Sequence, residues 1–199
     1  MINIETDSHG RTYQIWKQNQ MNSCGVASVW MARGIARQMS FAEEEWDLAQ
    51  RVYRNAVNNA VNNALAPLGV SSGGPMSLDP SAFPADQSSM AATLANTGFY
   101  AGQLAAAIRA EGLRAELVGW TGNSHRIVAN KIAINKPAIA LVAWNNGGGH
   151  FVVVGRCTAS QVSFLDPWDG HVNEEPNDGR YRARYGGRGF IGAVIYMSA

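Results

Sequence analysis

Two cysteines and four histidines occur in the chain, and one residue of each kind stands where nucleophilic catalysis would need it. Cys24 follows the polar stretch QNQMNS and precedes a largely apolar run, which predicts a position in the first turn of a helix. His150 precedes the apolar stretch FVVVG, and Asp166 ends the stretch VSFLD. A thiol attacks as its thiolate, which a helix N-terminus and an adjacent imidazolium both stabilise. The three residues therefore predict acyl transfer by a Cys-His-Asp triad.

The spacing between His150 and Asp166 supports their pairing. If residues 150–156 and 160–166 form an antiparallel hairpin with its turn centred on Thr158, the two residues lie directly opposite each other. Opposite residues point to the same side of a sheet with β-carbons about 4.5 to 5.5 Å apart, so the carboxylate can hold the imidazole in one tautomer. A one-residue shift of register would separate them, and Asp169 is then the alternative carboxylate.

Attack of a thiolate on an amide also creates an oxyanion, which needs hydrogen-bond donors already in position. A backbone N–H of the first helical turn is one such donor. Gln18 stands six residues before Cys24 and can supply a side-chain amide if the intervening loop folds back. Gln20 is an alternative donor at a different spacing.

These residues must be positioned by helices in the first part of the chain and strands in the second. Four segments are predicted as helices: 25–36 with Asn22 or Ser23 as N-cap, 40–66 with a capping box of Ser40 and Glu43, 101–112, and 123–137. Five segments rich in β-branched or aromatic residues are predicted as strands: 113–120, 138–144, 151–155, 162–166 and 190–197. The strands 138–197 are expected to form one largely antiparallel sheet, which gives the α+β class.

The length of 199 residues suits one domain, which we predict to span residues 1–199. Within it, the segment 67–100 is rich in Gly, Pro and Ser and is predicted to be a long loop or insertion. Cys24 and Cys157 are too few for a disulfide framework or a cysteine-based zinc site. We therefore expect reduced thiols. Acyl transfer by the predicted triad implies no metal and no organic cofactor.

The composition and the charge argue against several classes of partner. A net charge of +1 gives no broad basic field for nucleic acid, and the arginines of GRYRARYGGRG are assigned to a solvated loop or edge strand. The N-terminus lacks the pattern of a secretory signal peptide, and no apolar run reaches the roughly 18 residues that a membrane-spanning helix needs. We therefore expect no nucleic-acid partner and no membrane insertion. The chain is expected to be cytoplasmic, or secreted by a route that needs no N-terminal signal peptide.

In their order along the chain, the stretches QNQMNSCGVAS, GGGHFVVVG and VSFLDPWDG resemble the Gln, Cys-Gly, Gly-His and Asp-Pro blocks of papain-like cysteine peptidases. They are most similar to the bacterial C39-type and related effector-type peptidases. The resemblance implies a papain-like fold, in which N-terminal helices, with the nucleophile at the start of the central helix, pack on a C-terminal antiparallel sheet. It implies peptide-bond hydrolysis through a thioester acyl-enzyme. Cys24 would be the nucleophile, His150 the general base and acid, Asp166 the orienting group and Gln18 the oxyanion donor.

The resemblance implies a protein or peptide substrate and leaves its nature open. A papain-like deamidase or amide transferase, acting as a bacterial toxin or effector, would use the same triad, and a catalytically idle module would only bind peptides. An inhibitor or immunity protein is a possible partner. The candidate substrate-binding residues are Gly148, Gly149, Trp144 and Trp168. The glycines before His150 suggest close approach of a ligand or of another backbone. For both tryptophans two assignments stay open: a position in the core, or a position in the wall of a substrate cleft.

The remaining cysteine and histidines lack a comparable setting. Cys157 stands at the predicted turn beside Arg156 and is assigned to a structural, unreactive thiol. His9, His125 and His171 are assigned to the surface.

Overall fold

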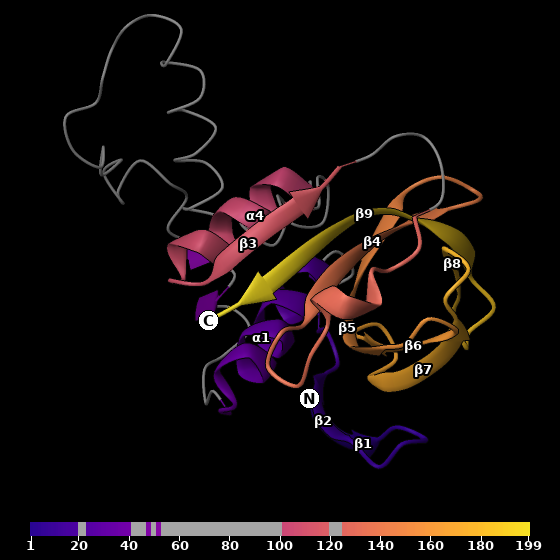
Figure 1. Cartoon of the computed structure of the whole chain (residues 1–199). Helices are drawn as coiled ribbons and strands as arrows, with labels where there is room; N and C mark the ends of the chain where they lie inside the picture. The colour runs from indigo at the N-terminus through magenta and orange to yellow at the C-terminus, as the bar shows by residue number, and fades with distance from the viewer. Residues whose placement is uncertain (20–22, 41–46, 49–50, 53–100, 120–124) are drawn as a thin grey trace, which may run out of the picture.

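The computed structural model describes residues 1–19, 23–40, 47–48, 51–52, 101–119 and 125–199 (Figure 1). In chain order the elements are β1 (Ile2–Thr6), β2 (Thr12–Trp16), α1 (Cys24–Arg37), α4 (Ala101–Ala110), β3 (Arg114–Val118), a short 3-10 helix (Ala129–Lys131), β4 (Ala138–Trp144), β5 (Gly149–Cys157), β6 (Gln161–Asp166), β7 (His171–Pro176), β8 (Arg180–Arg182) and β9 (Arg188–Ser198). The expected combination of helices with an antiparallel sheet is confirmed.

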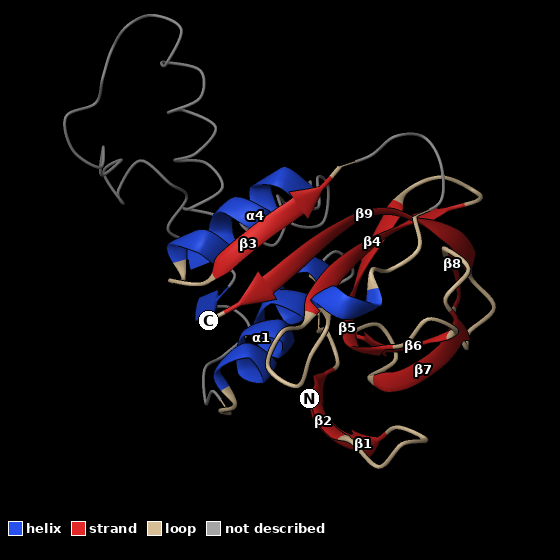
Figure 2. Ribbon diagram, viewed as in Figure 1, coloured by secondary structure: helices blue, strands red, loops and turns tan. Residues whose placement is uncertain are grey.

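A seven-stranded antiparallel sheet forms the centre of the molecule (Figure 2). Six strands follow the order β3-β9-β4-β5-β6-β7, and β8 pairs with β9. The helices α1 and α4 pack on the same face of this sheet, where their apolar side chains share one core. The first two strands, β1 and β2, form a separate hairpin.

Both faces of the sheet are buried at its centre. Phe151 and Val153 point into the core that contains α1 and α4, whereas Val152 and Val154 belong to a second core on the opposite face. Strands buried on both faces read as continuous apolar runs, which explains the stretch FVVV in β5. The second core is completed by β8 and by the segment around Ile127.

Most predicted elements within the described residues are found. The helix predicted at 25–36 is α1, the helix at 101–112 is α4, and the strands at 138–144, 151–155, 162–166 and 190–197 are β4, β5, β6 and β9. The strands β1, β2 and β7 were not predicted, and β8 lies in the stretch assigned to a solvated loop or edge strand. The helix predicted from Ser40 and the segment 67–100 lie outside the described residues, apart from Ser40 itself and residues 47–48 and 51–52.

The helix predicted at 123–137 is wrong. From residue 125 to Pro137, only Ala129–Lys131 form a turn of 3-10 helix. The backbone before it bonds to side chains of the sheet region: the N–H of Ile127 donates to Oδ1 of Asn177 at 2.9 Å, and the N–H of Val128 donates to the hydroxyl of Tyr196 at 3.0 Å. These tertiary bonds replace the bonds that a helix would have formed.

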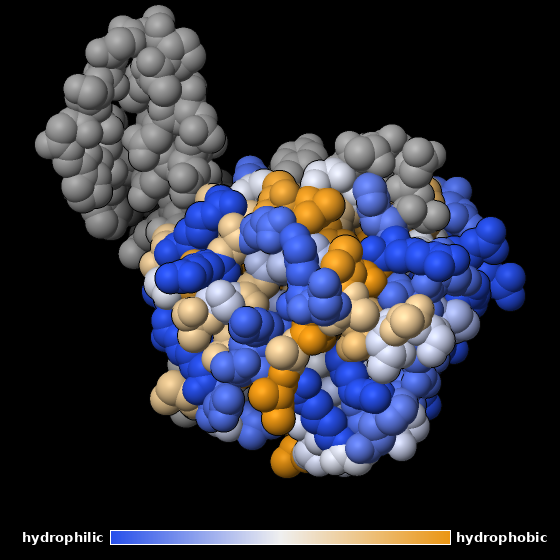
Figure 3. Space-filling view, viewed as in Figure 1, coloured by the Kyte–Doolittle hydropathy of each residue, from blue (hydrophilic) through white to orange (hydrophobic). Residues whose placement is uncertain are grey.

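The surface in the view of Figure 3 is mostly hydrophilic, with hydrophobic residues gathered in a narrow strip across its middle. Many large apolar side chains, by contrast, are fully buried, among them Phe164, Met31 and Ile139. In the part of the chain that the structure describes, no helix has the length and apolar character to cross a membrane.

Replacing Gly189 with alanine is expected to destabilise the sheet. Gly189 lies opposite Trp144 of β4 on one side and Tyr181 of β8 on the other. A β-carbon added there would lie 2.3 Å from the carbonyl oxygen of Ala143, so the backbone would have to move. We expect a loss of about 1 to 3 kcal/mol in the free energy of unfolding, measured by urea denaturation.

Gly102 in α4 provides the matched control for this substitution. A β-carbon there meets nothing within 4 Å, so Gly102→Ala should gain about 0.5 to 1 kcal/mol of stability through helix propensity. Equal effects of the two substitutions would contradict the close packing at Gly189.

Candidate active site

Cys24 is the first residue of α1, at the end where backbone N–H groups lack partners within the helix. Ser23 stands at the N-cap position, and its carbonyl accepts the N–H of Ala27 at 3.0 Å. The helix from Gly25 to Arg33 is buried, so the core fixes the direction in which its N-terminus points. The helix dipole at this end favours a negative charge, such as a thiolate carries.

His150 lies in β5, directly after the turn from β4, and only 4% of its surface is exposed. Its Nε2 atom lies 2.7 Å from Oδ1 of Asp166. The side chain of Cys24 also acts on His150, because its hydrogen bonding and its charge help to raise the pKa of the ring. Trp144 stacks on the imidazole, with ring centroids 5.6 Å apart and an angle of 15° between the planes. The ring is therefore held by Asp166 at one edge and by Trp144 on one face.

The charge state of this imidazole is set by its two partners. Burial disfavours the protonated ring, but the hydrogen bonds and charges of Asp166 and Cys24 outweigh burial and raise the pKa of His150 to about 10. Burial likewise opposes ionisation of Asp166, but its hydrogen bond to His150 and the imidazolium charge hold the pKa of the carboxyl below its ordinary value. At neutral pH an imidazolium thus lies between a carboxylate and a sulfur atom.

Asp166 ends β6 and is held by three donors. Besides His150, the backbone N–H of Trp168 donates to Oδ1 at 2.8 Å, and the hydroxyl of Tyr181 donates to Oδ2 at 2.5 Å. The residue is 1% exposed, and a buried carboxylate needs such partners to remain charged. Because both oxygen atoms are bonded, the carboxylate presents one fixed edge to the imidazole.

The predicted register of the β5–β6 hairpin is wrong, although the predicted contact is present. Val153 lies opposite Leu165, and the register shifts by one residue at Gly155. Continued along the strands, this pairing puts Asp166 two residues away from the position directly opposite His150. A shift of two residues keeps a side chain on the same face, so the two residues become diagonal neighbours within reach of long side chains.

Gln18 is brought to the same end of the sheet as these three residues. It follows β2, is half-buried, and donates its backbone N–H to the carbonyl of Pro167 at 2.7 Å, directly after Asp166. This backbone contact is compatible with the oxyanion role, which stays a prediction. The alternative donor Gln20 lies outside the described residues.

The N-terminal strand β1 also fixes the turn that follows Asp166. Nδ2 of Asn3 donates to the carbonyl of Gly170 at 3.0 Å. The Glu5 carboxylate accepts the N–H of Val172 at 2.8 Å and forms an ion pair with His171. His171, predicted at the surface, is half-buried in this contact.

The alternative residues take other partners. The carboxylate of Asp169 accepts the N–H of His171 at 3.0 Å, while Asp166 is the carboxylate bonded to His150. Cys157 ends β5 as a free, half-buried thiol, and burial raises its pKa to about 11. It is therefore a neutral thiol at physiological pH.

The glycines before His150 have a local explanation. Gly147 and Gly148 have φ angles of +92° and +82°, which the β4–β5 turn requires and which other residues adopt at a cost. In this turn the N–H of Trp144 donates to the Gly148 carbonyl at 3.2 Å. Gly149 begins β5, where an added β-carbon would lie 3.2 Å from Cδ1 of Leu141. Turn geometry and strand packing thus account for all three, and the assignment of Gly148 and Gly149 to substrate binding stays a prediction.

A row of aromatic rings extends outward from the imidazole. Trp144, half-buried on His150, lies 6.4 Å from the ring of Tyr185, which lies 6.1 Å from Trp168. Tyr185 is 44% exposed and Trp168 is 42% exposed. The position of these exposed rings suits a wall beside a bound peptide.

The two tyrosines of this region were not among the predicted site residues. Tyr181 and Tyr185 lie in the stretch GRYRARYGGRG, of which only the arginines were assigned a position from the sequence. The alternation Arg180-Tyr181-Arg182 was a usable signal, because in a strand it puts the tyrosine on the face opposite the arginines. Arg182 indeed pairs with Glu175 at 2.7 Å, while Tyr181 is fully buried.

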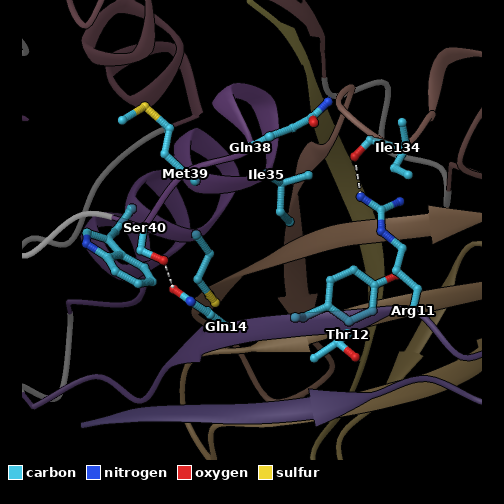
Figure 4. A pocket seen from close by; sticks show the side chains of 12 residues that line it. Arg11, Thr12, Gln14, Ile35, Gln38, Met39, Ser40 and Ile134 are labelled. Atoms are coloured by element: carbon cyan, nitrogen blue, oxygen red, sulfur yellow. Dashed lines mark hydrogen bonds between the residues drawn. The ribbon is translucent and has the colours of Figure 1, made fainter.

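A pocket of about 360 Å³ lies elsewhere, between β2 and the second half of α1 (Figure 4). Ser40 and Gln14, bonded at 2.9 Å, lie at one side of it, and Arg11 and Ile134 at the other. Ile35, which lines it, is eleven residues beyond Cys24, or about 16 Å along the helix axis. The pocket is thus separate from the candidate active site. Among the described residues, no three His, Cys, Asp or Glu side chains are grouped as metal ligands would be.

The raised pKa of His150 predicts a loss of stability at alkaline pH. The free residue titrates near 6.5 and the folded one near 10, so between these values the folded chain binds more protons than the unfolded chain. The stabilisation is complete below about pH 6.5 and is lost as the pH rises through about 10. Urea denaturation at pH 6, 8 and 10 should show the advantage of the wild type over His150→Gln shrinking with pH. A constant difference would contradict the raised pKa.

Comparison with known proteins adds little to this geometry. No described protein family matches the sequence, and no curated protein matches it. Among solved structures 15 chains match, including the crystal structure of the Pseudomonas avirulence protein AvrPphB, with 14% identity, 90% of this chain and 92% of that chain covered, and a TM-score of 0.37. A TM-score of this size does not establish a common fold.

Proposed function

We propose that the chain is a papain-like cysteine peptidase that hydrolyses a peptide bond through a thioester formed on Cys24. One observation carries the proposal: the buried imidazole of His150 bonds to the fully hydrogen-bonded carboxylate of Asp166, and its pKa is raised further by the thiol of Cys24 at a helix N-terminus. A structural histidine needs neither a thiol partner nor a raised pKa. A thiolate nucleophile needs both a proton acceptor and a means of keeping that proton nearby.

The proposed reaction follows from the proton on His150. The Cys24 sulfur bonds to the carbonyl carbon of a substrate amide, and the imidazolium gives its proton to the leaving nitrogen, which departs as an amine. Water then attacks the thioester carbon and gives a proton to His150. The C–S bond breaks, the acyl part of the substrate leaves as a carboxylic acid, and the thiolate and the imidazolium are restored. Asp166 keeps the ring in one orientation throughout. The backbone N–H of Cys24 and the amide of Gln18 are the proposed oxyanion donors.

The proposed substrate is a protein or peptide. Trp144 and Trp168 would form one wall of its binding site, and Gly148 and Gly149 would let its backbone approach the end of β5. A protein inhibitor would use the same surface. The exposure of Trp168, beside the buried dyad of His150 and Asp166, supports this placement.

The first experiment tests the nucleophile. We expect iodoacetamide at pH 6 to alkylate Cys24 rapidly and stoichiometrically, because the proposed imidazolium of His150 stabilises the reactive thiolate. An ordinary thiol, with a pKa near 8.5, reacts slowly at this pH. Cys157 in the same molecule is the internal control, because burial keeps it protonated. Tryptic mass spectrometry locates the label. Equal labelling of the two cysteines would contradict the proposal and would favour a module that only binds peptides.

The second experiment identifies the bond that is attacked. Cell extracts treated with the wild type or with Cys24→Ala are compared for new N-termini, and candidate substrates are then weighed intact. Peptide cleavage gives fragments that depend on Cys24. A deamidase would instead change the mass of an uncut protein, and that result would replace the peptidase assignment.

A further inference from the structure

Tyr181 lies directly behind the catalytic carboxylate. It is the central residue of β8, has no exposed surface, and donates its hydroxyl hydrogen to Oδ2 of Asp166 at 2.5 Å. The other oxygen, Oδ1, serves His150 and the N–H of Trp168. Tyr181 is therefore bonded to the carboxylate oxygen that does not bond the imidazole.

The pairing of β8 with β9, and of β9 with β4, fixes the position of this tyrosine in the sheet. Gly189 of β9 lies between Trp144 of β4 and Tyr181 of β8, opposite both. The rings of Trp144 and Tyr181 lie 6.0 Å apart. Gly189 itself packs on the backbone of β4, where an added β-carbon would lie 2.3 Å from the carbonyl oxygen of Ala143. Phe164 packs edge-on against the tyrosine at 5.1 Å. The ring is thus fixed before any substrate binds.

Tyr181 can act only as a hydrogen-bond donor to Asp166. Burial and the neighbouring carboxylate raise the pKa of the phenol well above its ordinary value, so the hydroxyl keeps its proton. A donor of this kind stabilises the ionised carboxylate and prevents it from rotating.

We propose that Tyr181 is a positioning residue of the active site, which holds Asp166 in the orientation that aligns His150 with Cys24. The proposal rests on the peptidase function proposed above and extends the Cys-His-Asp triad by one residue. Tyr181 does not touch the substrate; it acts through Asp166. Its removal should therefore lower the rate of the chemical step and leave substrate binding unchanged.

Tyr13 offers a matched control for removing the hydroxyl. Its hydroxyl donates to Oδ2 of Asp7 at 2.9 Å, and both residues are buried. This pair has the same chemistry as Tyr181 and Asp166 but lies in the N-terminal hairpin region. Tyr13→Phe and Tyr181→Phe should cost similar stability, so any further effect of Tyr181→Phe belongs to the active site.

Three readouts separate positioning from stability. For Tyr181→Phe we expect Cys24 alkylation at pH 6 to slow about tenfold, because a hydrogen bond to a charged group has been lost. On a substrate from the cleavage screen we expect kcat to fall by a similar factor with KM unchanged. The downfield NMR resonance of the His150 proton that faces Asp166 should shift. Tyr13→Phe should leave all three as in the wild type.

The outcomes distinguish this proposal from the proposed function. If wild-type Cys24 reacts rapidly and Tyr181→Phe reacts equally fast with an unshifted resonance, Tyr181 is structural and the peptidase assignment stands. If wild-type Cys24 is unreactive, the proposed function fails, while the NMR resonance still reports whether Tyr181 orients the dyad. Should Tyr181→Phe not fold, 3-fluorotyrosine at position 181 keeps the ring and makes the hydroxyl a stronger donor. An unchanged resonance in that variant would overturn the positioning role.

Discussion

Replacing Cys24 with alanine should abolish turnover, by at least about 10³-fold, and leave the chain folded. The sulfur is the only atom proposed to bond to the substrate, so without it no acyl-enzyme can form. Alanine remains compatible with the first turn of a helix, and Cys24 is only half-buried, so the loss of stability should be small. Turnover is measured on a substrate from the cleavage screen, and folding by circular dichroism and urea denaturation.

Cys157→Ala is the control for this prediction. Cys157 ends the same strand that carries His150, yet its sulfur contacts the carbonyl of Thr158 and the amide of Asn177. Its removal should leave kcat and KM unchanged. Activity that survives Cys24→Ala and disappears in Cys157→Ala would exchange the roles of the two cysteines and refute the site described above.

The side-chain types and their order along the chain were enough to bring Cys24, His150 and Asp166 together in prediction. Local sequence could not predict the register of β5 and β6, the strands that carry His150 and Asp166. Gly155 interrupts the pairing of β5 with β6, and an added β-carbon there would lie 2.6 Å from the ring of Tyr13. The interruption thus occurs where β5 meets a residue far away in the sequence. The predicted contact between His150 and Asp166 is nevertheless present, because a two-residue shift keeps each side chain on the same face of the sheet.

Strands buried on both faces were easier to predict than strands held by polar contacts. The stretches of β4, β5 and β9 are continuously apolar, and their strand character is visible locally. In β1 and β7, by contrast, exposed and half-buried residues prevail. β1 is held against the sheet by Asn3 and Glu5, whose partners lie more than 160 residues away. No local sequence pattern predicts such long-range hydrogen bonds.

Tyr181 was missed for a related reason. Its neighbours Arg180 and Arg182 make the stretch look like a solvated loop, and β8 is only three residues long. Its position depends on the pairing of β8 with β9, and of β9 with β4, which local sequence does not reveal. The most exact positioning of the site thus comes from residues that carry no catalytic signature in the sequence.

Replacing Asp166 with asparagine should lower kcat by about 10³- to 10⁴-fold and destabilise the fold. The substitution keeps the shape of the side chain but removes the buried charge that helps to hold His150 protonated. Burial, now unopposed by that charge, should bring the pKa of His150 down from about 10. Disrupting a buried charge pair typically costs about 3 to 5 kcal/mol, which urea denaturation can measure. The pKa of His150 is followed by NMR titration.

Asp169→Asn is the control for this prediction, because it removes a different carboxylate from the same turn. Asp169 is three residues further on, and its carboxylate accepts the N–H of His171 rather than bonding to the imidazole of His150. Asparagine can still accept that bond through its side-chain oxygen, so this control should retain activity and leave the titration of His150 near its wild-type value. If instead Asp166→Asn left the pKa of His150 unchanged, the carboxylate would not be what keeps the ring charged. The buried hydrogen bond between the two residues would then be structural, and His150 would have to act without an orienting partner.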